Sequence, residues 1–356
     1  MDGPSVSRGE LREALLAEGR PDGSVRCAVC LRRCAIPPGE VGYCWTRLNL
    51  DGTLYTLTYG RVAALQHSPV ERKPLYHFYP GELMLSVGSV GCNFRCPGCQ
   101  NWHIAHEDAR QAVGEIEYVS PENLVEQALE AKSLGISWTY NEPTIWLEYT
   151  VDCARLARRH GLLTNYVTNG AITPEALALI GPLLDAFRVD LKGFSRETYR
   201  RVANFPDFGG VLEATKLARH TYGAHVECVT NLTPGTNDDP EELRALARWI
   251  VQELGPETPW HVTRFVPHLE LAHVPTTPVA KLEEARQLGL EEGLRYVYIG
   301  NVPGHPAEDT YCPGCGQVVI ERGHTFRPRV FLREGRCPHC QTHIAGRFRP
   351  DYTVAE

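Results

Sequence analysis

The placement of the cysteines constrains the fold of this 356-residue chain more than any other feature, because eleven of the thirteen fall into three short clusters. The clusters are Cys27/Cys30/Cys34/Cys44, Cys92/Cys96/Cys99 and Cys312/Cys315/Cys337/Cys340. Thiols grouped in this way in a reducing compartment indicate metal binding and not a disulfide framework. Each cluster therefore requires the chain to close around a metal centre. The two remaining cysteines, Cys153 and Cys228, lie in apolar segments and are expected to be buried as small hydrophobic side chains.

The middle cluster has three cysteines in the spacing C-x3-C-x2-C. Three thiolates hold three corners of a cubane iron–sulfur cluster and leave the fourth iron open, and an open iron can bind a cofactor. Gly88 and Gly91 provide the backbone freedom for a tight turn around such a cluster. The alternative is a structural zinc site that lacks its fourth ligand.

The two outer clusters have four cysteines each. Cys312-Pro-Gly-Cys315 and Cys337-Pro-His-Cys340 form two C-x2-C knuckles with 21 residues between them, which is typical of a zinc ribbon or of a rubredoxin-like iron site. We predict structural zinc there. For the N-terminal four, the spacing favours a structural metal, and a second iron–sulfur cluster that feeds electrons to the first stays open as an alternative.

Composition indicates a globular enzyme, with 43% hydrophobic and 22% charged residues. The net charge of −7 gives no reason to expect a nucleic-acid partner. The best apolar run, Ala176–Phe187, is interrupted by Gly181-Pro182, and the start at Met1 lacks the features of a signal peptide. We therefore expect a cytoplasmic protein with no membrane contact.

From about Leu83 onward, short apolar segments alternate with helical ones, whereas a short helix is expected near Gly9–Glu18. The expected strands are Leu83–Val87, Ile136–Tyr140, Leu162–Val167, Ala186–Leu191, His225–Val229, His261–Phe265 and Tyr296–Ile299. The expected helices are Pro121–Ser133, Thr144–His160, Pro174–Ile180, Gly210–Arg219, Pro240–Glu253 and Val279–Leu288. This alternation predicts an α/β fold, a partial TIM-type barrel of about six units that is open on one side. We expect an N-terminal four-cysteine segment over 1–82, the barrel over 83–303 and a C-terminal four-cysteine segment over 304–356.

Polar side chains lie at the ends of three of the expected strands. They are Asn141 and Glu142, then Asn169, then Asp190 and Lys192. Their ordinary roles are helix capping, a turn and mutual neutralisation, respectively. In barrels of this kind, however, the chemistry lies where strands end. We therefore predict that these five side chains bind a ligand as well.

The chain resembles a known family at several of these motifs. The C-x3-C-x2-C loop resembles the cluster loop of radical S-adenosylmethionine (SAM) enzymes, and Asp190-Leu-Lys192 resembles the D-x-K element of pyruvate formate-lyase-type activating enzymes. Together with the N-terminal cysteines and the Thr139–Thr144 run, nearly the whole chain resembles the radical SAM proteins of the AmmeMemoRadiSam system. That system is named for its association with AMMECR-type and Memo-type proteins.

The resemblance implies a [4Fe–4S] cluster on Cys92, Cys96 and Cys99, with SAM bound at the open iron. It implies that SAM is also held by Asn141, Glu142, Asn169, Asp190 and Lys192. An electron from a flavodoxin or ferredoxin would cleave SAM to a 5′-deoxyadenosyl radical, which abstracts hydrogen from a substrate. By analogy the substrate is a glycine in a partner protein, with AMMECR-type and Memo-type proteins as candidate partners.

One position departs from the family, because Gly98 stands where an aromatic residue usually packs near the adenine. Phe94 or Trp102 is expected to substitute for it.

Two other functions remain as alternatives. Residues 321–350 hold seven arginines against two glutamates, with Phe326, Phe331 and Phe348 between them, which suggests radical SAM modification of RNA. The third hypothesis is an inactive, zinc-stabilised scaffold protein.

Overall fold

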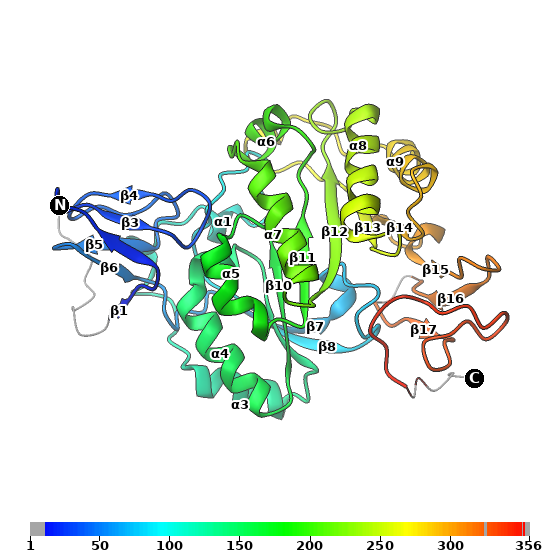
Figure 1. Cartoon of the computed structure of the whole chain (residues 1–356), viewed down its shortest axis with the longest axis horizontal. Coiled ribbons are helices and arrows are strands. Elements are labelled where there is room, and N and C mark those ends of the chain that lie inside the picture. The colour runs from blue at the N-terminus through cyan, green and yellow to red at the C-terminus, as the bar shows by residue number, and fades with distance from the viewer. Residues whose placement is uncertain (1–10, 324–325, 351, 353–356) are drawn as a thin grey trace. The chain divides into compact units, whose positions relative to one another are not determined.

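The computed structural model describes residues 11–323, 326–350 and 352 (Figure 1). The chain divides into two compact units, and it passes between them more than once. The first unit comprises Met1–His67, Met84–Phe187 and Gly209–Ala224. The second comprises Ser68–Leu83, Arg188–Phe208 and His225–Glu356. The three-part division expected from the sequence, with boundaries near 82 and 303, stays a prediction.

The first unit is built on parallel strands. β8 (Leu83–Gly88), β9 (Gly135–Trp138) and β10 (Leu163–Thr168) pair in parallel, with Ile136 opposite both Leu85 and Thr164. Every residue of β9 is buried, as expected of a parallel strand covered on both faces. Helices α3 (Pro121–Glu130), α4 (Leu147–Arg159) and α5 (Pro174–Ile180) pack against one another in sequence, and α4 also packs on β9 and β10.

The starts of these helices follow from local sequence. The Thr173 hydroxyl accepts a hydrogen bond from the Ala176 N–H, and Pro174 occupies the first turn, where its missing N–H costs nothing. Ser120 caps α3 in the same way.

Shorter elements of the first unit are α1 (Trp102–Ala105), α2 (Ala109–Ala112), η3 (Pro143–Trp146) and η4 (Gly181–Leu183). α7 (Phe208–His220) lies almost entirely in this unit.

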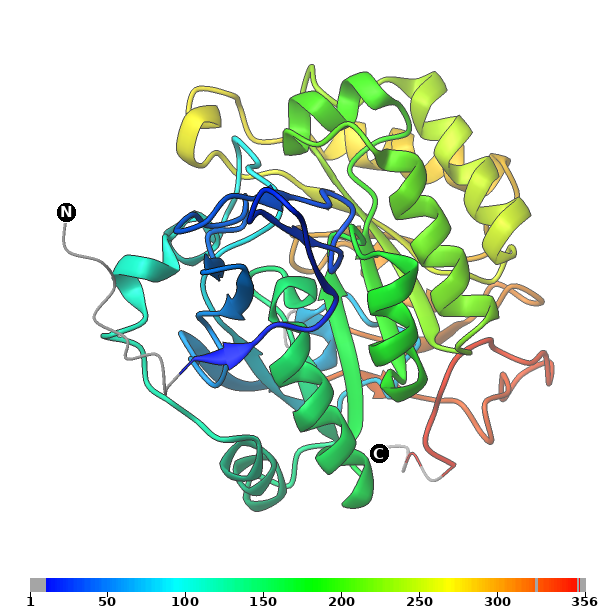
Figure 2. The same cartoon turned by 60° about the vertical axis from the view of Figure 1, so that its left-hand side comes forward.

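The N-terminal part of the first unit forms two small antiparallel sheets, which Figure 2 brings forward. One contains β1 (Arg12–Glu13), β6 (Thr53–Thr56) and β5 (Arg47–Leu50), and the other β2 (Ala17–Gly19), β3 (Val25–Cys27) and β4 (Ala35–Ile36). The prediction of a helix near Gly9–Glu18 is wrong for residues 11–18, which are the part of that range that the structure describes. There the chain pairs with β6 and β3, and these tertiary pairings override local helix propensity.

The second unit repeats the parallel arrangement. β12 (His225–Leu232), β13 (Trp260–Arg264) and β14 (Val297–Gly300) pair in parallel, and α9 (Val279–Glu291) packs on β13 and β14. Gly289 permits this packing, because a Cβ there would lie 2.9 Å from the Trp260 ring. α8 (Pro240–Trp249), capped by Asp239, continues into η5 (Ile250–Leu254) and packs on α9. α6 (Arg196–Ala203) also belongs here, whereas β11 (Ala186–Asp190) and β7 (Ala64–Pro69) each have residues in both units.

The C-terminal part of the second unit has its own small core. β15 (Thr310–Tyr311), β16 (Val318–Glu321) and β17 (Arg329–Val330) form an antiparallel sheet. The buried Arg322 guanidinium lies over the Tyr76 ring and donates to the Tyr76 carbonyl at 2.8 Å. The 3-10 turns η2 (Val70–Arg72), η6 (Leu269–Leu271) and η7 (Pro306–Glu308) complete this unit. The core cluster comprises Tyr76, Tyr296, Tyr298, Cys312, Val319, Ile320, Val330, Leu332, Cys337 and Ile344.

Parallel strands alternating with helices confirm the predicted α/β class with a mainly parallel sheet. The expected strands and helices from Leu83 onward agree with the observed ones to within a few residues. Within the described residues, no helix has the length and apolar character needed to cross a bilayer.

Candidate functional site

The three-cysteine loop follows β8 and requires glycine at its start. Gly91 has φ +82°, and a Cβ there would lie 2.6 Å from the Cys44 carbonyl oxygen. A Cβ on Gly88 would lie 2.6 Å from the Thr139 carbonyl oxygen. Backbone therefore meets backbone at both positions, and no larger residue fits without a shift.

Asn141, which follows β9, holds this loop in place. Its Oδ1 accepts from the Ser89 N–H at 3.1 Å, and its Nδ2 donates to the Gly91 carbonyl at 3.0 Å. On the other side of the loop, the Asn101 amide donates to the Tyr140 carbonyl at 2.7 Å. Two amide side chains thus tie the cysteine loop to the end of the neighbouring strand.

The Cys92 sulfur lies among N–H donors. The Phe94 N–H donates to it at 3.3 Å, and Asn169 Nδ2 lies 3.8 Å from it. Asn169 Nδ2 also donates to Asn93 Oδ1 at 2.7 Å. N–H donors of this kind favour a thiolate and tune the metal that it binds. Burial, followed by the negative charge of Glu142, raises the pKa of the free Cys92 thiol well above its usual value. A bound metal would reverse that shift, because metal coordination deprotonates a thiol outright.

Glu142 joins the ends of β9 and β10. Its carboxylate accepts from the Thr144 N–H at 3.0 Å, the Thr168 hydroxyl at 2.7 Å and the Asn169 N–H at 2.8 Å. The side chain is buried, and burial raises its pKa although these hydrogen bonds oppose the shift. Glu142 therefore caps η3, as its ordinary role predicts, and also fixes the backbone that presents the Asn169 amide to Cys92.

Asp190 and Lys192 lie in the second unit, at the end of β11 and just after it. Lys192 Nζ donates to Asp190 Oδ2 at 2.9 Å, and Arg188 forms a further ion pair with the same carboxylate. Burial would raise the pKa of Asp190, but the charges of Arg188 and Lys192 outweigh burial and lower it. Sequence reasoning missed Arg188, although the two-residue period of a strand places it on the same face as Asp190.

The C-terminal cysteines form a compact four-sulfur group. The sulfurs of Cys312, Cys315, Cys337 and Cys340 all lie within 4.8 Å of one another. Four thiolates on one zinc ion, with bonds of about 2.3 Å, lie about 3.8 Å apart. The Cys312–Cys340 and Cys315–Cys337 sulfur separations of 3.5 and 3.7 Å match that geometry. The predicted metal-binding group is therefore present, and it fits a single ion.

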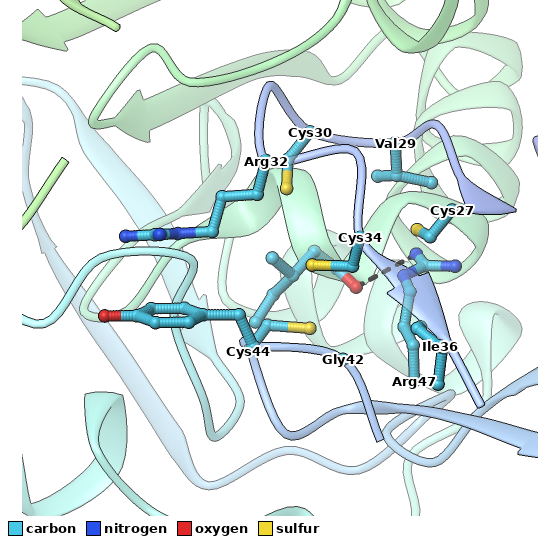
Figure 3. Close-up of a pocket in the computed structure, with 11 residues that line it drawn as sticks. Cys27, Val29, Cys30, Arg32, Cys34, Ile36, Gly42, Cys44 and Arg47 are labelled. Atoms are coloured by element: carbon cyan, nitrogen blue, oxygen red, sulfur yellow. Dashed lines mark hydrogen bonds between the residues drawn. The ribbon is translucent and has the colours of Figure 1, made fainter. Parts of the chain in front are cut away.

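The N-terminal cysteines also come together. Cys27, Cys30, Cys34 and Cys44 line one cavity of the first unit (Figure 3). Cys27, Cys30 and Cys44 are buried. Arg47 and Ile145 contribute to the same wall, and neither was singled out from the sequence.

Arg95 is a further residue that sequence reasoning missed. Its guanidinium donates to the Cys92 carbonyl at 2.7 Å and to the Tyr43 carbonyl at 2.8 Å, and it lies over the Trp45 ring. It therefore ties the three-cysteine loop to the N-terminal cysteine segment. An arginine between two cysteines carries no sequence signal of such a role.

The two residues expected to replace an aromatic side chain at Gly98 differ in exposure. Phe94 is buried, with 1% of its surface exposed, whereas Trp102 is 46% exposed. Trp102 alone of the two presents a ring that a ligand could contact.

Three of the seven arginines of residues 321–350 are engaged within the chain. Arg322 is buried, Arg329 pairs with Glu321, and Arg349 contacts Glu82 at 2.5 Å. The side chains of Arg327, Arg333 and Arg336 are exposed, so the RNA alternative stays a prediction.

The cysteine loop and the strands whose ends hold it lie within residues 86–250, which match the Radical SAM superfamily. The chain therefore contains a radical SAM domain over these residues. Over 339 residues it is 42% identical to the uncharacterized protein MJ0808 of Methanocaldococcus jannaschii, and the match covers 94% of this chain and 99% of that protein. The two are members of one family.

Solved structures resemble the chain more distantly. A domain of pyruvate-formate lyase-activating enzyme from Bacteroides vulgatus is 15% identical, with a TM-score of 0.41 over 47% of this chain and 99% of that one. Streptococcus suis SuiB, bound to S-adenosylmethionine, is 13% identical, with a TM-score of 0.47 over 69% of this chain and 56% of that one.

Proposed function

We propose that this chain is a radical SAM enzyme that modifies or activates a partner protein. The proposal is supported most by the Cys92 loop, whose first sulfur receives N–H donors and whose backbone is clamped by the ends of β9 and β10. Cys92, Cys96 and Cys99 would hold a [4Fe–4S] cluster. With SAM bound, that centre would supply one-electron cleavage of the sulfonium to methionine and a 5′-deoxyadenosyl radical that abstracts hydrogen.

The donor set fits a polynuclear cluster better than a single ion. Among the described residues, only the C-terminal cysteines bring ligand atoms within 4.8 Å of one another as a group. The sulfurs of Cys92, Cys96 and Cys99 are therefore spread more widely than one zinc ion requires. A cubane, which takes each thiolate on a different iron, suits that spread.

The protein side chains would then orient the ligand and exclude water. Asn141 fixes the loop backbone, and Asn169 directs its amide toward the Cys92 sulfur. Glu142 acts as a positioning residue, because its oxygens already accept hydrogen bonds from Thr144, Thr168 and Asn169.

We further propose that Arg188 and Lys192, which surround Asp190, attract the carboxylate of SAM. The strands would close as a partial barrel around this cofactor. The C-terminal cysteines would bind structural zinc. The reductant would be a flavodoxin or ferredoxin, and AMMECR-type and Memo-type proteins are the candidate partners.

Anaerobic reconstitution with iron and sulfide tests the proposal. We expect a low-potential cluster signal in electron paramagnetic resonance, and 5′-deoxyadenosine from SAM and dithionite. The triple Cys92/Cys96/Cys99→Ala variant should lose 5′-deoxyadenosine formation, whereas Cys153→Ala, which removes a buried cysteine outside the clusters, should retain it. A reconstituted wild-type protein that produces no 5′-deoxyadenosine would leave the scaffold hypothesis standing.

A further inference from the structure

The N-terminal cysteine segment contains a second site built from four thiols. Figure 3 shows the sulfurs of Cys27, Cys30, Cys34 and Cys44 directed toward one space. Apolar side chains complete the wall, among them Val29, Ile36 and Ile145.

These four sulfurs are too widely spaced for one zinc ion. In the C-terminal group all four ligand sulfurs lie within 4.8 Å of one another, with pairs at 3.5 and 3.7 Å. The N-terminal cysteines are among the described residues, and no three of them meet that limit. A centre with several metal ions, each taking one thiolate at its periphery, requires wider spacing.

An orphaned donor lies on the same wall. Arg47 lines the cavity, is 1% exposed, and its Nε has no hydrogen-bond partner among the described residues. Its two terminal nitrogens are already committed, each donating to Glu148 at 2.8 Å. A buried N–H without an acceptor is destabilising, so an acceptor at this position is expected. The sulfide and thiolate sulfurs of an iron–sulfur cluster are such acceptors.

We infer that Cys27, Cys30, Cys34 and Cys44 bind a second [4Fe–4S] cluster, fully ligated by protein, which is the alternative that the sequence left open beside a structural metal. Four thiolates occupy all four irons, so this centre has no open position for SAM. A centre of this kind stores or passes electrons.

The two cysteine segments are in direct contact, which suits electron transfer between them. The Cys44 carbonyl approaches Gly91, next to Cys92. Arg32 Nε donates to the Asn93 carbonyl, and the Arg32 guanidinium lies 3.5 Å from the centre of the Tyr43 ring.

The role of the second cluster rests on the proposed function, whereas its metal content does not. A flavodoxin- or ferredoxin-class protein would reduce it by one electron, and it would pass that electron to the Cys92 cluster. No bond or proton changes place in this transfer.

Metal analysis of the full chain tests the inference. For the anaerobically reconstituted wild-type protein we expect about eight iron and about eight sulfide ions per chain, together with one zinc ion. For the Cys92/Cys96/Cys99→Ala variant we expect about four iron and about four sulfide ions per chain. That variant should show the spectrum of a fully ligated cluster that SAM leaves unchanged. The Cys27/Cys30/Cys34/Cys44→Ser variant should also retain about four iron, since its Cys92 loop is intact.

The outcomes separate the two proposals. Two zinc ions and no iron in the Cys92/Cys96/Cys99→Ala variant would overturn the inference of a second cluster. A metal-free N-terminal site would also overturn it, provided that the circular dichroism of that chain matches the wild type. If the four-serine variant fails to fold, Cys44→Ser and Cys153→Ala provide the comparison. Cys44→Ser should perturb the spectrum of the second cluster, and Cys153→Ala should not. A second cluster in a protein that never cleaves SAM would uphold this inference and reject the proposed function.

Discussion

The buried ion pair between Arg47 and Glu148 should anchor the N-terminal cysteine segment to α4. The two side chains are 2% and 3% exposed, and the guanidinium meets the carboxylate through two hydrogen bonds of 2.8 Å. Glu148 also accepts from the Leu15 N–H at 2.7 Å. Glu148→Gln keeps the shape of the side chain but leaves the charge of Arg47 buried without compensation. Breaking a buried pair in this way costs about 3–5 kcal/mol.

Hydrogen exchange followed by mass spectrometry measures that cost in the intact metal-loaded protein. A loss of about 3 kcal/mol corresponds to local opening more than a hundredfold more frequent, so amides of β5 and α4 should exchange faster by at least that factor. Glu257→Gln is the matched control, because its pair with Arg295 is 39% and 48% exposed and is worth about 0–1 kcal/mol. An increase below tenfold in Glu148→Gln, similar to that of the control, would refute the reasoning.

Three further predictions concern other parts of the chain. Trp102→Ala should weaken SAM binding about tenfold or more in a titration, because an aromatic ring stacked on a base contributes about 1–3 kcal/mol; Tyr118→Ala removes another exposed ring and should change nothing. Burial lowers the pKa of His77 from 6.5 to about 3, so the stability that its neutral ring provides is complete above pH 6.5 and decreases as the pH falls toward 3. The advantage of wild type over His77→Gln in urea unfolding should thus shrink by up to about 1.4 kcal/mol per pH unit below 6.5, and a constant difference between pH 7 and 5 would contradict this. Cys337→Ser should release the zinc proposed at the C-terminal cysteines, detectable with a chromogenic chelator, and expose the core around it to proteolysis. Retention of zinc by this variant would show that the four cysteines are not its site.

Much of the fold was predictable because its signals are local. The knuckles at Cys312 and Cys337 are short enough for their spacing to determine the sulfur positions, and Thr173 and Asp239 mark helix starts by their own hydrogen bonds. Alternating apolar segments then indicated the parallel strands.

What could not be predicted depends on residues far apart in the sequence. Strands β1 and β2 replace the expected helix because their partners lie in β6 and β3. The pairing of Arg47 with Glu148 spans 101 residues. The width of the N-terminal sulfur group likewise depends on tertiary packing, so the spacing of its cysteines left zinc and iron–sulfur both open.

The contact at Gly91 has a consequence for how the protein matures and is damaged. Because the Cys44 carbonyl meets the backbone there with no side chain between them, neither cysteine loop can relax without displacing the other. Damage that moves the loop of one centre should therefore disturb the ligands of its neighbour, whereas a centre that loses its metal without moving its loop leaves the other intact.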